Sequence, residues 1–191
     1  MRRTRKIGRI SMEGMVRLAP VIAICAACAL SRSGRSSASA NGPVGHPIAL
    51  QARDLSGREV DVAADRGRVR VIDLWATWCE PCRDELPDLD RLSRELGGRG
   101  LSVYAVSFDE DRSEIPAFLH EIPVGFPLLW EQGGGSVAAA FQVKGLPTTI
   151  LVDRQGVVRF IHEGYDERIA AAERREIEEL LAEDGPLTPP R

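Results

Sequence analysis

Hydrophobic and polar residues follow one another along the chain in blocks that predict strands and helices. The clearest block is Val69–Trp75, a β-branched apolar run that is typical of a buried strand. After it, four leucines between Leu86 and Leu96 recur at spacings of three and four, which predicts a helix with one apolar face. A second apolar run, Leu101–Phe108, predicts another buried strand.

The remaining blocks predict shorter elements. Two weak strands, Ile48–Ala52 and Glu59–Val62, flank a turn and predict a hairpin ahead of the main strands. The later pattern predicts, in order, a helix over Ser113–Glu121 capped by Ser113, a strand over Phe126–Trp130, a short helix over Ser136–Phe141, a hairpin of Thr148–Asp153 with Val157–His162, and an amphipathic helix over Arg168–Leu181. This alternation predicts an α/β fold with a central mixed sheet flanked by helices.

A Cys-x-x-Cys pair, Cys79 and Cys82, lies between the first buried strand and the helix that follows. The thiolate is the reactive form of cysteine, and a helix N-terminus stabilises negative charge. We therefore expect Cys79 to lie exposed at the helix start with a lowered pKa, and Cys82, three residues on, to close onto it. Pro81 suits the first turn of a helix. The layout predicts a redox-active disulfide between Cys79 and Cys82.

This stretch resembles the thioredoxin superfamily over roughly Pro43 to Asp184. It looks most like the membrane-tethered, extracytoplasmic thiol-disulfide oxidoreductases of the TlpA and ResA kind, which carry Trp-Cys-Glu-Pro-Cys followed by Glu and Pro. The resemblance implies a thioredoxin-like fold for residues 41–184, with the early hairpin as an N-terminal extension. The residues that carry it are Asp73, Trp75, Ala76, Trp78, Cys79, Pro81, Cys82 and Pro87, with Gly145, Leu146, Pro147 and Thr148 downstream.

The resemblance also implies how such a site would work. Cys79 would be the nucleophile that attacks a substrate disulfide, and Cys82 the resolving thiol that breaks the mixed disulfide. Pro147 would be a cis-proline facing the dithiol. The exposed backbone at Leu146 would then pair with an extended segment of the substrate.

Two acids are candidates for handling the proton of Cys82. Asp73 occupies the position where thioredoxins place a buried acid, and a buried carboxyl group has a raised pKa and can accept that proton. Glu85 matches the helix glutamate of the ResA-like group, and we expect it to influence the thiol pKa and the fit of a partner. The alternative for Glu85 is a solvated helix face. A chain that carries both acids departs from either pattern.

Three residues around the cysteines are expected to meet the substrate. Trp78 should be a partly exposed platform, and Pro81 lies next to it in the motif. Glu80 places a negative charge between the cysteines, which opposes thiolate formation and favours a reductant over a strong oxidant. We expect no metal site, because no second Cys or His pair appears at ligand spacing, and no cofactor other than the disulfide.

The first 40 residues differ in charge from the rest of the 191-residue chain. They hold eight Arg or Lys and one Glu, a charge of +7, whereas the remainder holds 17 basic and 27 acidic residues, a charge of −10. Leu18–Leu30 is a thirteen-residue uncharged run, too short to span a membrane comfortably and typical of a signal peptide. Residues 1–40 are therefore expected to be a signal peptide or membrane tether, and the proline-rich residues 185–191 a disordered tail.

Three outcomes stay open for this N-terminal segment. The chain is cleaved before Asn41, after an Ala-x-Ala site; or it is cleaved before Cys28, in a relaxed lipobox, and lipidated there; or it keeps an uncleaved anchor. All three place the domain outside the cytoplasm, in a periplasm or cell envelope.

The leading functional prediction is a thiol-disulfide oxidoreductase that reduces disulfides in other proteins. The resemblance makes apocytochrome c or copper-site assembly factors candidate substrates and a membrane thiol transporter a candidate electron donor. We expect a monomer held at the membrane by its tether, and the acidic body argues against nucleic-acid binding.

Two alternatives remain. One is a thiol peroxidase, although Thr77-Trp78-Cys79 does not reproduce the Thr-x-x-Cys site of the peroxiredoxins. The other is a Cu(I)-binding chaperone, for which the cysteine spacing is one residue short of Cys-x-x-x-Cys.

Overall fold

The computed structural model describes residues 43–183, and their strands form one seven-stranded sheet in the order β2-β1-β5-β4-β3-β6-β7. The central strands β3, β4 and β5 are parallel, and the flanking strands pair antiparallel to their neighbours. The strands are β1 (Gln51–Asp54), β2 (Glu59–Asp61), β3 (Val69–Trp75), β4 (Leu101–Ser107), β5 (Leu128–Trp130), β6 (Thr148–Val152) and β7 (Val158–Glu163).

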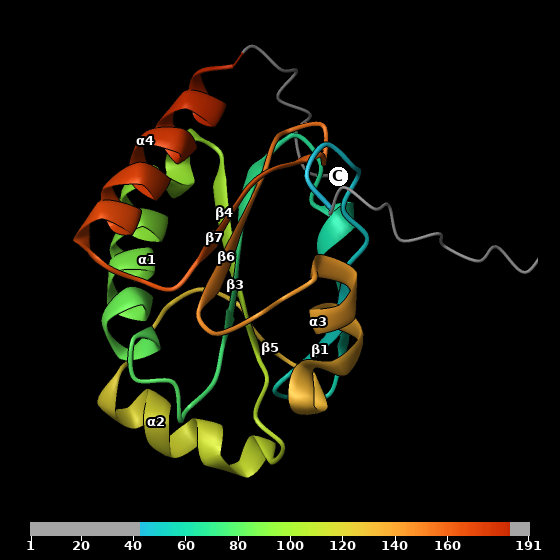
Figure 1. Ribbon diagram of the computed structural model, residues 1–191, viewed down its shortest axis with the longest axis vertical. Coiled ribbons are helices and arrows are strands. Elements are labelled where there is room, and N and C mark those ends of the chain that lie inside the picture. Colours follow the sequence, from blue (N-terminus) through green and yellow to red (C-terminus); the bar gives the residue numbers. More distant parts are fainter. Residues whose placement is uncertain (1–42, 184–191) are drawn as a thin grey trace, which may run out of the picture. The chain divides into compact units, whose positions relative to one another are not determined.

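Helices cover both faces of this sheet. In Figure 1, α1 and α4 lie side by side on one face, and α3 lies on the other. Alternate residues of β3 point to opposite faces: Trp75 packs among the side chains of α1 and α4, whereas Leu74 packs among those of α3. The predicted mixed α/β fold is confirmed. The helices are α1 (Cys82–Leu96), α2 (Ile115–Glu121), α3 (Gly135–Phe141) and α4 (Glu167–Ala182).

The N-terminal hairpin is present, but it begins later than predicted. Its first strand is β1 and not Ile48–Ala52, because the backbone N–H of Ile48 donates to the carbonyl of Gly156 and so draws this part of the chain away from β2. The Asp54 carboxylate accepts the backbone N–H groups of Ser56 and Arg58 and so fixes the turn. The hairpin extends the sheet through the pairing of β1 with β5.

Two other boundaries also differ from the prediction. The strand predicted to begin at Phe126 begins at Leu128, because Pro127 has no N–H to donate. Ser113 is not the cap of the helix that follows β4. The Asp111 side chain accepts the backbone N–H of Ser113 and starts a short 3₁₀ turn, after which α2 begins at Ile115.

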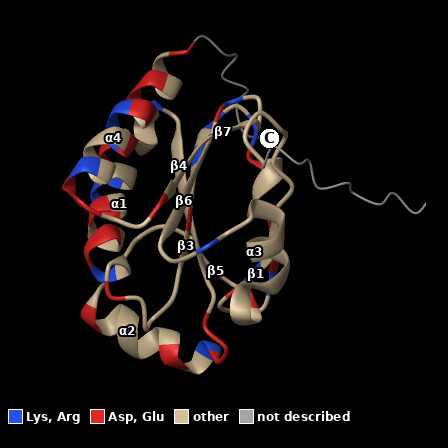
Figure 2. Cartoon of the chain, viewed as in Figure 1, with Lys and Arg blue, Asp and Glu red and all other residues tan. Residues whose placement is uncertain are grey.

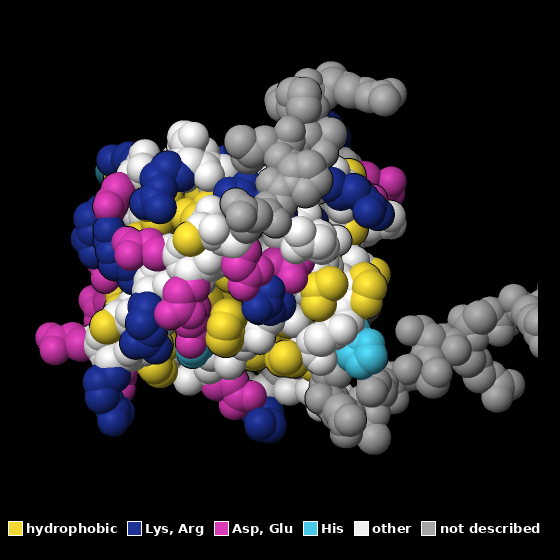
Figure 3. Space-filling view, turned by 90° about the horizontal axis from the view of Figure 1, so that it is seen from above, with side chains coloured by type: hydrophobic (Ala, Val, Ile, Leu, Met, Phe, Trp, Pro, Cys, Tyr) yellow, Lys and Arg dark blue, Asp and Glu magenta, His cyan; other side chains and the backbone are white. Residues whose placement is uncertain are grey.

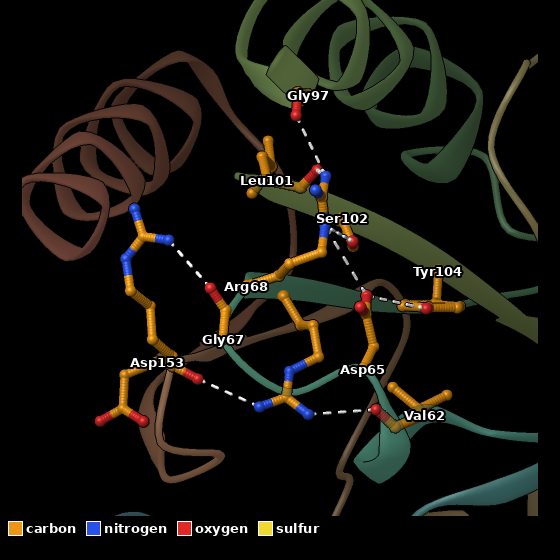
Figure 4. Close-up of polar contacts among 11 residues, drawn as sticks. Val62, Asp65, Gly67, Arg68, Gly97, Leu101, Ser102, Tyr104 and Asp153 are labelled. Atoms are coloured by element: carbon orange, nitrogen blue, oxygen red, sulfur yellow. Dashed lines mark hydrogen bonds and ion pairs between the residues drawn. The ribbon is translucent and has the colours of Figure 1, made fainter. Parts of the chain in front are cut away.

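Buried arginines hold the end of β3 that lies away from the cysteines (Figure 4). Arg70 is fully buried, and its guanidinium group donates to the carbonyls of Val62 and Asp153, each at 3.1 Å. Arg154 similarly donates to the carbonyl of Gly67 at 2.9 Å. These bonds tie the loop before β3 to the hairpin of β6 and β7, so the start of β3 is fixed on both sides.

Basic and acidic residues alternate along α1 and α4 (Figure 2). Arg174 of α4 pairs with Glu95 of α1. The face seen in Figure 3 also carries acidic and basic side chains interspersed with one another.

Within residues 43–183 none of the helices has both the length and the apolar character needed to cross a membrane. The predicted cleavage sites, the lipidation of Cys28 and the tail over residues 185–191 lie outside the described residues.

Candidate active site

Two loops meet at one edge of the sheet. The loop Ala76–Pro81 leaves the end of β3 and leads into α1, and the loop Val143–Pro147 leads into the start of β6. Since Leu74 of β3 lies opposite Thr148 of β6, both loops emerge at the same place. The Leu146–Pro147 peptide bond is cis, as predicted.

Cys79 and Cys82 form a disulfide bond in the first of these loops, with an S–S distance of 2.02 Å. The helix α1 begins at Cys82, with Pro81 at its N-cap position, so Cys79 lies three residues before the helix and not in its first turn. The prediction that Cys79 is exposed is wrong: it is only 4% exposed, because it packs with Trp75 and Cys82 in the core cluster under α1. In this oxidised form, the exposed surface next to the cysteines is formed by their neighbours.

Those neighbours form the outer surface of the site. Trp78 is 67% exposed, which is more than the partial exposure that the sequence predicts. Glu80 and Pro81 are also exposed. A cavity of about 390 Å³ opens beside Trp78 and extends to Leu146. Among residues 43–183, the N–H and C=O of Leu146 have no backbone hydrogen-bond partner. The site therefore offers an apolar groove next to open backbone groups.

Asp109 holds the loop that precedes the cysteines. This residue is 1% exposed, and its carboxylate accepts the backbone N–H of Thr77 at 3.1 Å and the Thr77 hydroxyl at 2.7 Å. The Ser107 hydroxyl donates to the same carboxylate at 2.7 Å. The sequence analysis did not select Asp109, although an acid directly after a buried parallel strand is a usable signal, because such strand ends gather at one edge of the sheet.

Asp73 is fully buried in β3 and points toward the face covered by α1 and α4, as Trp75 does two residues later. Within the described residues neither of its carboxyl oxygens has a hydrogen-bond partner. Burial, and then the charge of Glu173, raise the pKa of Asp73 well above its ordinary value. The position matches the buried acid that the sequence predicts.

Glu85 is also fully buried, one turn after Cys82 on the inward face of α1. The alternative of a solvated helix face is therefore wrong. The Thr149 hydroxyl donates to Glu85 Oε1. Burial, and then the charges of Asp73 and Glu173, raise the pKa of Glu85 well above its ordinary value.

A third buried acid, Glu173 of α4, was missed by the sequence analysis. It is 2% exposed, and burial raises its pKa to about 7, opposed by the nearby Thr149 hydroxyl and by His162. The signal was present: Glu173 interrupts the apolar stripe that Ile169 and Ile177 mark at helical spacing. One glutamate among many in this helix did not stand out.

No group of three or more His, Cys, Asp or Glu side chains within residues 43–183 has an arrangement that could hold a metal ion. The site that the described residues form is thus a disulfide, an apolar groove beside it and a set of buried acids behind it.

Comparisons with known proteins agree with this geometry. Residues 44–161 match the AhpC/TSA family. The chain is 33% identical over 115 residues to the thioredoxin-like protein YneN of Bacillus subtilis, and 29% identical over 111 residues to the thiol-disulfide oxidoreductase ResA of Halalkalibacterium halodurans. These matches cover 59% and 58% of this chain, and 66% and 62% of the two relatives, just under two thirds of their length.

Among solved structures, the fold is similar to that of a Chlorobium tepidum protein assigned as the thiol:disulfide interchange protein DsbE. The TM-score is 0.67 at 28% sequence identity, and the similarity covers 74% of this chain and 97% of that one. The predicted thioredoxin-like fold is therefore confirmed. The chain belongs to the AhpC/TSA family and, within the thioredoxin superfamily, is TlpA/ResA-like.

Proposed function

We propose that this protein is a thiol-disulfide oxidoreductase that reduces disulfides in other proteins. The observation that carries the proposal is the Cys79–Cys82 disulfide at the entrance to α1, next to a groove that Trp78 and Leu146 line together. A relative with the name thiol-disulfide oxidoreductase supports it. A dithiol in this position passes two electrons to a substrate when it closes to a disulfide.

In the proposed reaction the reduced protein attacks first through Cys79. Its thiolate forms a bond to one sulfur of the substrate disulfide, and the other substrate sulfur leaves as a thiolate. Cys82 then loses its proton, and its thiolate attacks the Cys79 sulfur and displaces the second substrate thiolate. The substrate gains two electrons, the protein is oxidised to the disulfide, and both released thiolates take protons from water.

The proton of Cys82 needs an acceptor inside the protein. Cys82 is fully buried, and Glu85 and Asp73 are the buried acids on the same side of the sheet. Burial raises the pKa of both carboxyl groups well above the ordinary value, which makes each a stronger base for this proton than an exposed carboxylate. Asp73 is the proposed acceptor, and Glu85 sets the thiol pKa through its charge.

Substrate contacts are proposed at the groove and the cis-proline loop. An extended segment of the substrate pairs with the open backbone of Leu146 and adds a short strand beside Pro147, while an apolar side chain rests against Trp78. The exposed Glu80 keeps the site less oxidising, because its charge opposes a thiolate at Cys79.

The proposed setting is outside the cytoplasm, and its support is the sequence of residues 1–40. A basic segment followed by a short apolar run and a small-residue cleavage region is typical of exported proteins. In that setting a monomer tethered at the membrane receives electrons from a membrane thiol donor. Apocytochrome c and copper-site assembly proteins are the candidate substrates.

Trapping the mixed disulfide tests this proposal. With Cys82→Ser the resolving thiol is absent, so we expect a substrate covalently bound through Cys79 to accumulate, visible as a reductant-sensitive band in gel electrophoresis. Insulin reduction should fall at least about 100-fold, because the second step is blocked. The Cys79→Ser variant is the matched control, since it has lost the attacking thiol and should trap nothing.

Other outcomes would reject the proposal. If Cys79→Ser traps substrate and Cys82→Ser does not, the roles of the cysteines are reversed. If the reduced wild-type protein consumes hydrogen peroxide but leaves insulin disulfides intact, it is a thiol peroxidase. If it binds one Cu(I) tightly and reduces nothing, it is a copper chaperone.

A further inference from the structure

We propose that Glu173 is the outlet of a proton relay that carries protons between the buried acids near Cys82 and solvent in a groove between α1 and α4. This inference rests on the proposed function and adds a positioning residue to it. The relay consists of Glu85, Thr149 and Glu173, with Asp73 beside it. These four residues come from four different elements: α1, β6, α4 and β3.

Thr149 is at the centre of this arrangement. In the sheet it lies opposite Asp73 on one side and opposite His162 on the other. Its hydroxyl donates to Glu85 and also faces Glu173. A hydroxyl group accepts one hydrogen bond while it donates another. When Glu85 carries a proton, it can donate to the Thr149 hydroxyl, which then turns to donate to an ionised Glu173. The three groups then form a continuous hydrogen-bonded path.

The acids along this path have carboxyl oxygens that lack hydrogen-bond partners. Within the described residues, both oxygens of Asp73, Oε2 of Glu85 and Oε1 of Glu173 are buried and have no hydrogen-bond partner. Ionised carboxylates that are buried together without partners repel one another and lack solvation. The three groups therefore share protons and titrate as a set.

Glu173 connects this set to water. A cavity of about 200 Å³ lies between α1 and α4, and Glu173 is the one of the three acids that lines it, together with Asp88, Leu92, Tyr165 and Ala170. The cavity is large enough for water, and Asp88, Arg91 and Arg174 supply polar groups in its otherwise mostly apolar lining. Protons on Glu173 can therefore exchange with solvent.

The charged groups around Glu173 come from every element packed against it. His162 favours the ionised carboxylate of Glu173, and Asp88 and Glu176 oppose it. His162 Nε2 lies 2.6 Å from a Glu176 oxygen, and the Tyr165 hydroxyl donates to Asp88 at 2.5 Å. Arg91 and Arg174 also line the cavity.

The relay works after Cys82 has given its proton to Asp73 and that proton has passed from Asp73 to Glu85, which titrates together with it. The proton on Glu85 passes to the Thr149 hydroxyl as that hydroxyl passes its own proton to the Glu173 carboxylate, and Glu173 releases it to water in the cavity. No electrons move in this step. The buried acids return to the ionised state and are ready for the next turnover.

Glu173→Gln tests the relay, because glutamine has the same shape and does not titrate. We expect attack by Cys79, measured as mixed-disulfide formation in a Cys82→Ser background, to stay within about 2-fold of wild type. Resolution by Cys82, measured as substrate release, should slow about 10-fold, and its pH profile should lose the inflection near pH 7. Wild-type resolution rates with an unchanged pH profile would overturn the relay.

A second measurement does not depend on turnover. With Cys79 alkylated, the thiolate absorbance of Cys82 reports the coupled titration of the acids around it. Wild-type protein should show an additional inflection near pH 7 that Glu173→Gln lacks and Glu173→Asp partly restores. The control is Glu179→Gln, an exposed glutamate of the same helix, which should behave as wild type. Identical curves for wild type and Glu173→Gln would reject the coupling even if the protein reduces no insulin.

Discussion

Charged residues are buried in this protein in two ways that have different consequences. Arg70 is fully buried, but its guanidinium group donates to two backbone carbonyls. Asp73 is equally buried and has no hydrogen-bond partner among residues 43–183. A buried ion without partners is far more costly than a neutral group, so Asp73 and its neighbours are held protonated at pH values where exposed acids ionise. The arginine is structural, and the acids are available for proton transfer.

Stability should therefore fall as the pH rises across the neutral range. Between pH 4.5 and about 7 folded Glu173 keeps a proton that the unfolded chain has released, so the free energy of unfolding decreases with pH until both states are ionised. The total loss from Glu173 is on the order of 3 kcal/mol. Asp73 and Glu85 act in the same direction. Urea unfolding of the oxidised protein at pH 5 and pH 8 measures the difference.

Glu173→Gln is the matched variant for this measurement, and it should show a smaller stability difference between the two pH values. Acids with lowered pKa values, such as Asp54 at about 2, do not interfere, because their contribution changes only below pH 4. An oxidised wild-type protein that is more stable at pH 8 than at pH 5 would contradict the expectation.

The residues that the sequence identifies correctly are those whose identity and spacing carry the chemistry. Cys79 and Cys82 pair as predicted, and Pro147 is cis. Glu85 and Glu173 are different, because each lies in a helix with several other charged residues, and only the packing of α1 and α4 on the sheet determines which glutamates are buried. Their burial depends on contacts between distant parts of the chain, and the only local sign of it is the place of Glu173 within the apolar stripe of its helix.

At the scale of elements, the start of α3 depends on one glycine. Gly134 has φ +64°, and a Cβ atom there would lie 2.2 Å from Cδ2 of Phe108. Gly135, the next residue, begins the helix with ordinary helical angles and has open space around its Cβ position. The two neighbouring glycines therefore have different requirements.

Gly134→Ala is expected to destabilise the protein by about 2–4 kcal/mol, because alanine adopts this backbone conformation poorly and the ring of Phe108 has to move. Gly135→Ala should be neutral or stabilise by up to about 1 kcal/mol, because alanine is the better helix former. Chemical denaturation of both variants measures the contrast. Equal stability of the two variants would contradict this, because it would mean that the Phe108 ring moves aside without destabilising the protein.

Element boundaries were predicted well where hydrophobic periodicity alone sets them and less well where a single polar contact does. The observed α4, Glu167–Ala182, differs by one residue at each end from the predicted helix. By contrast, the 3₁₀ turn that precedes α2 begins with a bond from the Ser113 backbone N–H to the Asp111 side chain, and either residue type is a good cap. The choice between two capping residues so close together is made by the path of the chain.

At the scale of the whole described region, the sheet brings together residues that are far apart in sequence. Leu74 and Thr148 are neighbours across β3 and β6, so the cysteine loop and the cis-proline loop meet without any direct sequence signal between them. The resemblance to thioredoxins predicted that these two loops would face each other. The relay through Thr149 was not foreseen, because it depends on the same register combined with the packing of α4.

The hairpin of β1 and β2 covers an edge that would otherwise be open. Along β5, Arg53 pairs with Trp130 and Asp54 with Leu129, and Leu129 is fully buried. Without residues 43–61 that strand would present bare N–H and C=O groups beside an uncovered apolar patch, which favours pairing with a strand from another molecule.

A chain lacking these residues should sediment as dimers and larger species, and a strictly monomeric shortened chain would refute this. The hairpin is thus expected to keep the protein from associating with other copies of itself through β5.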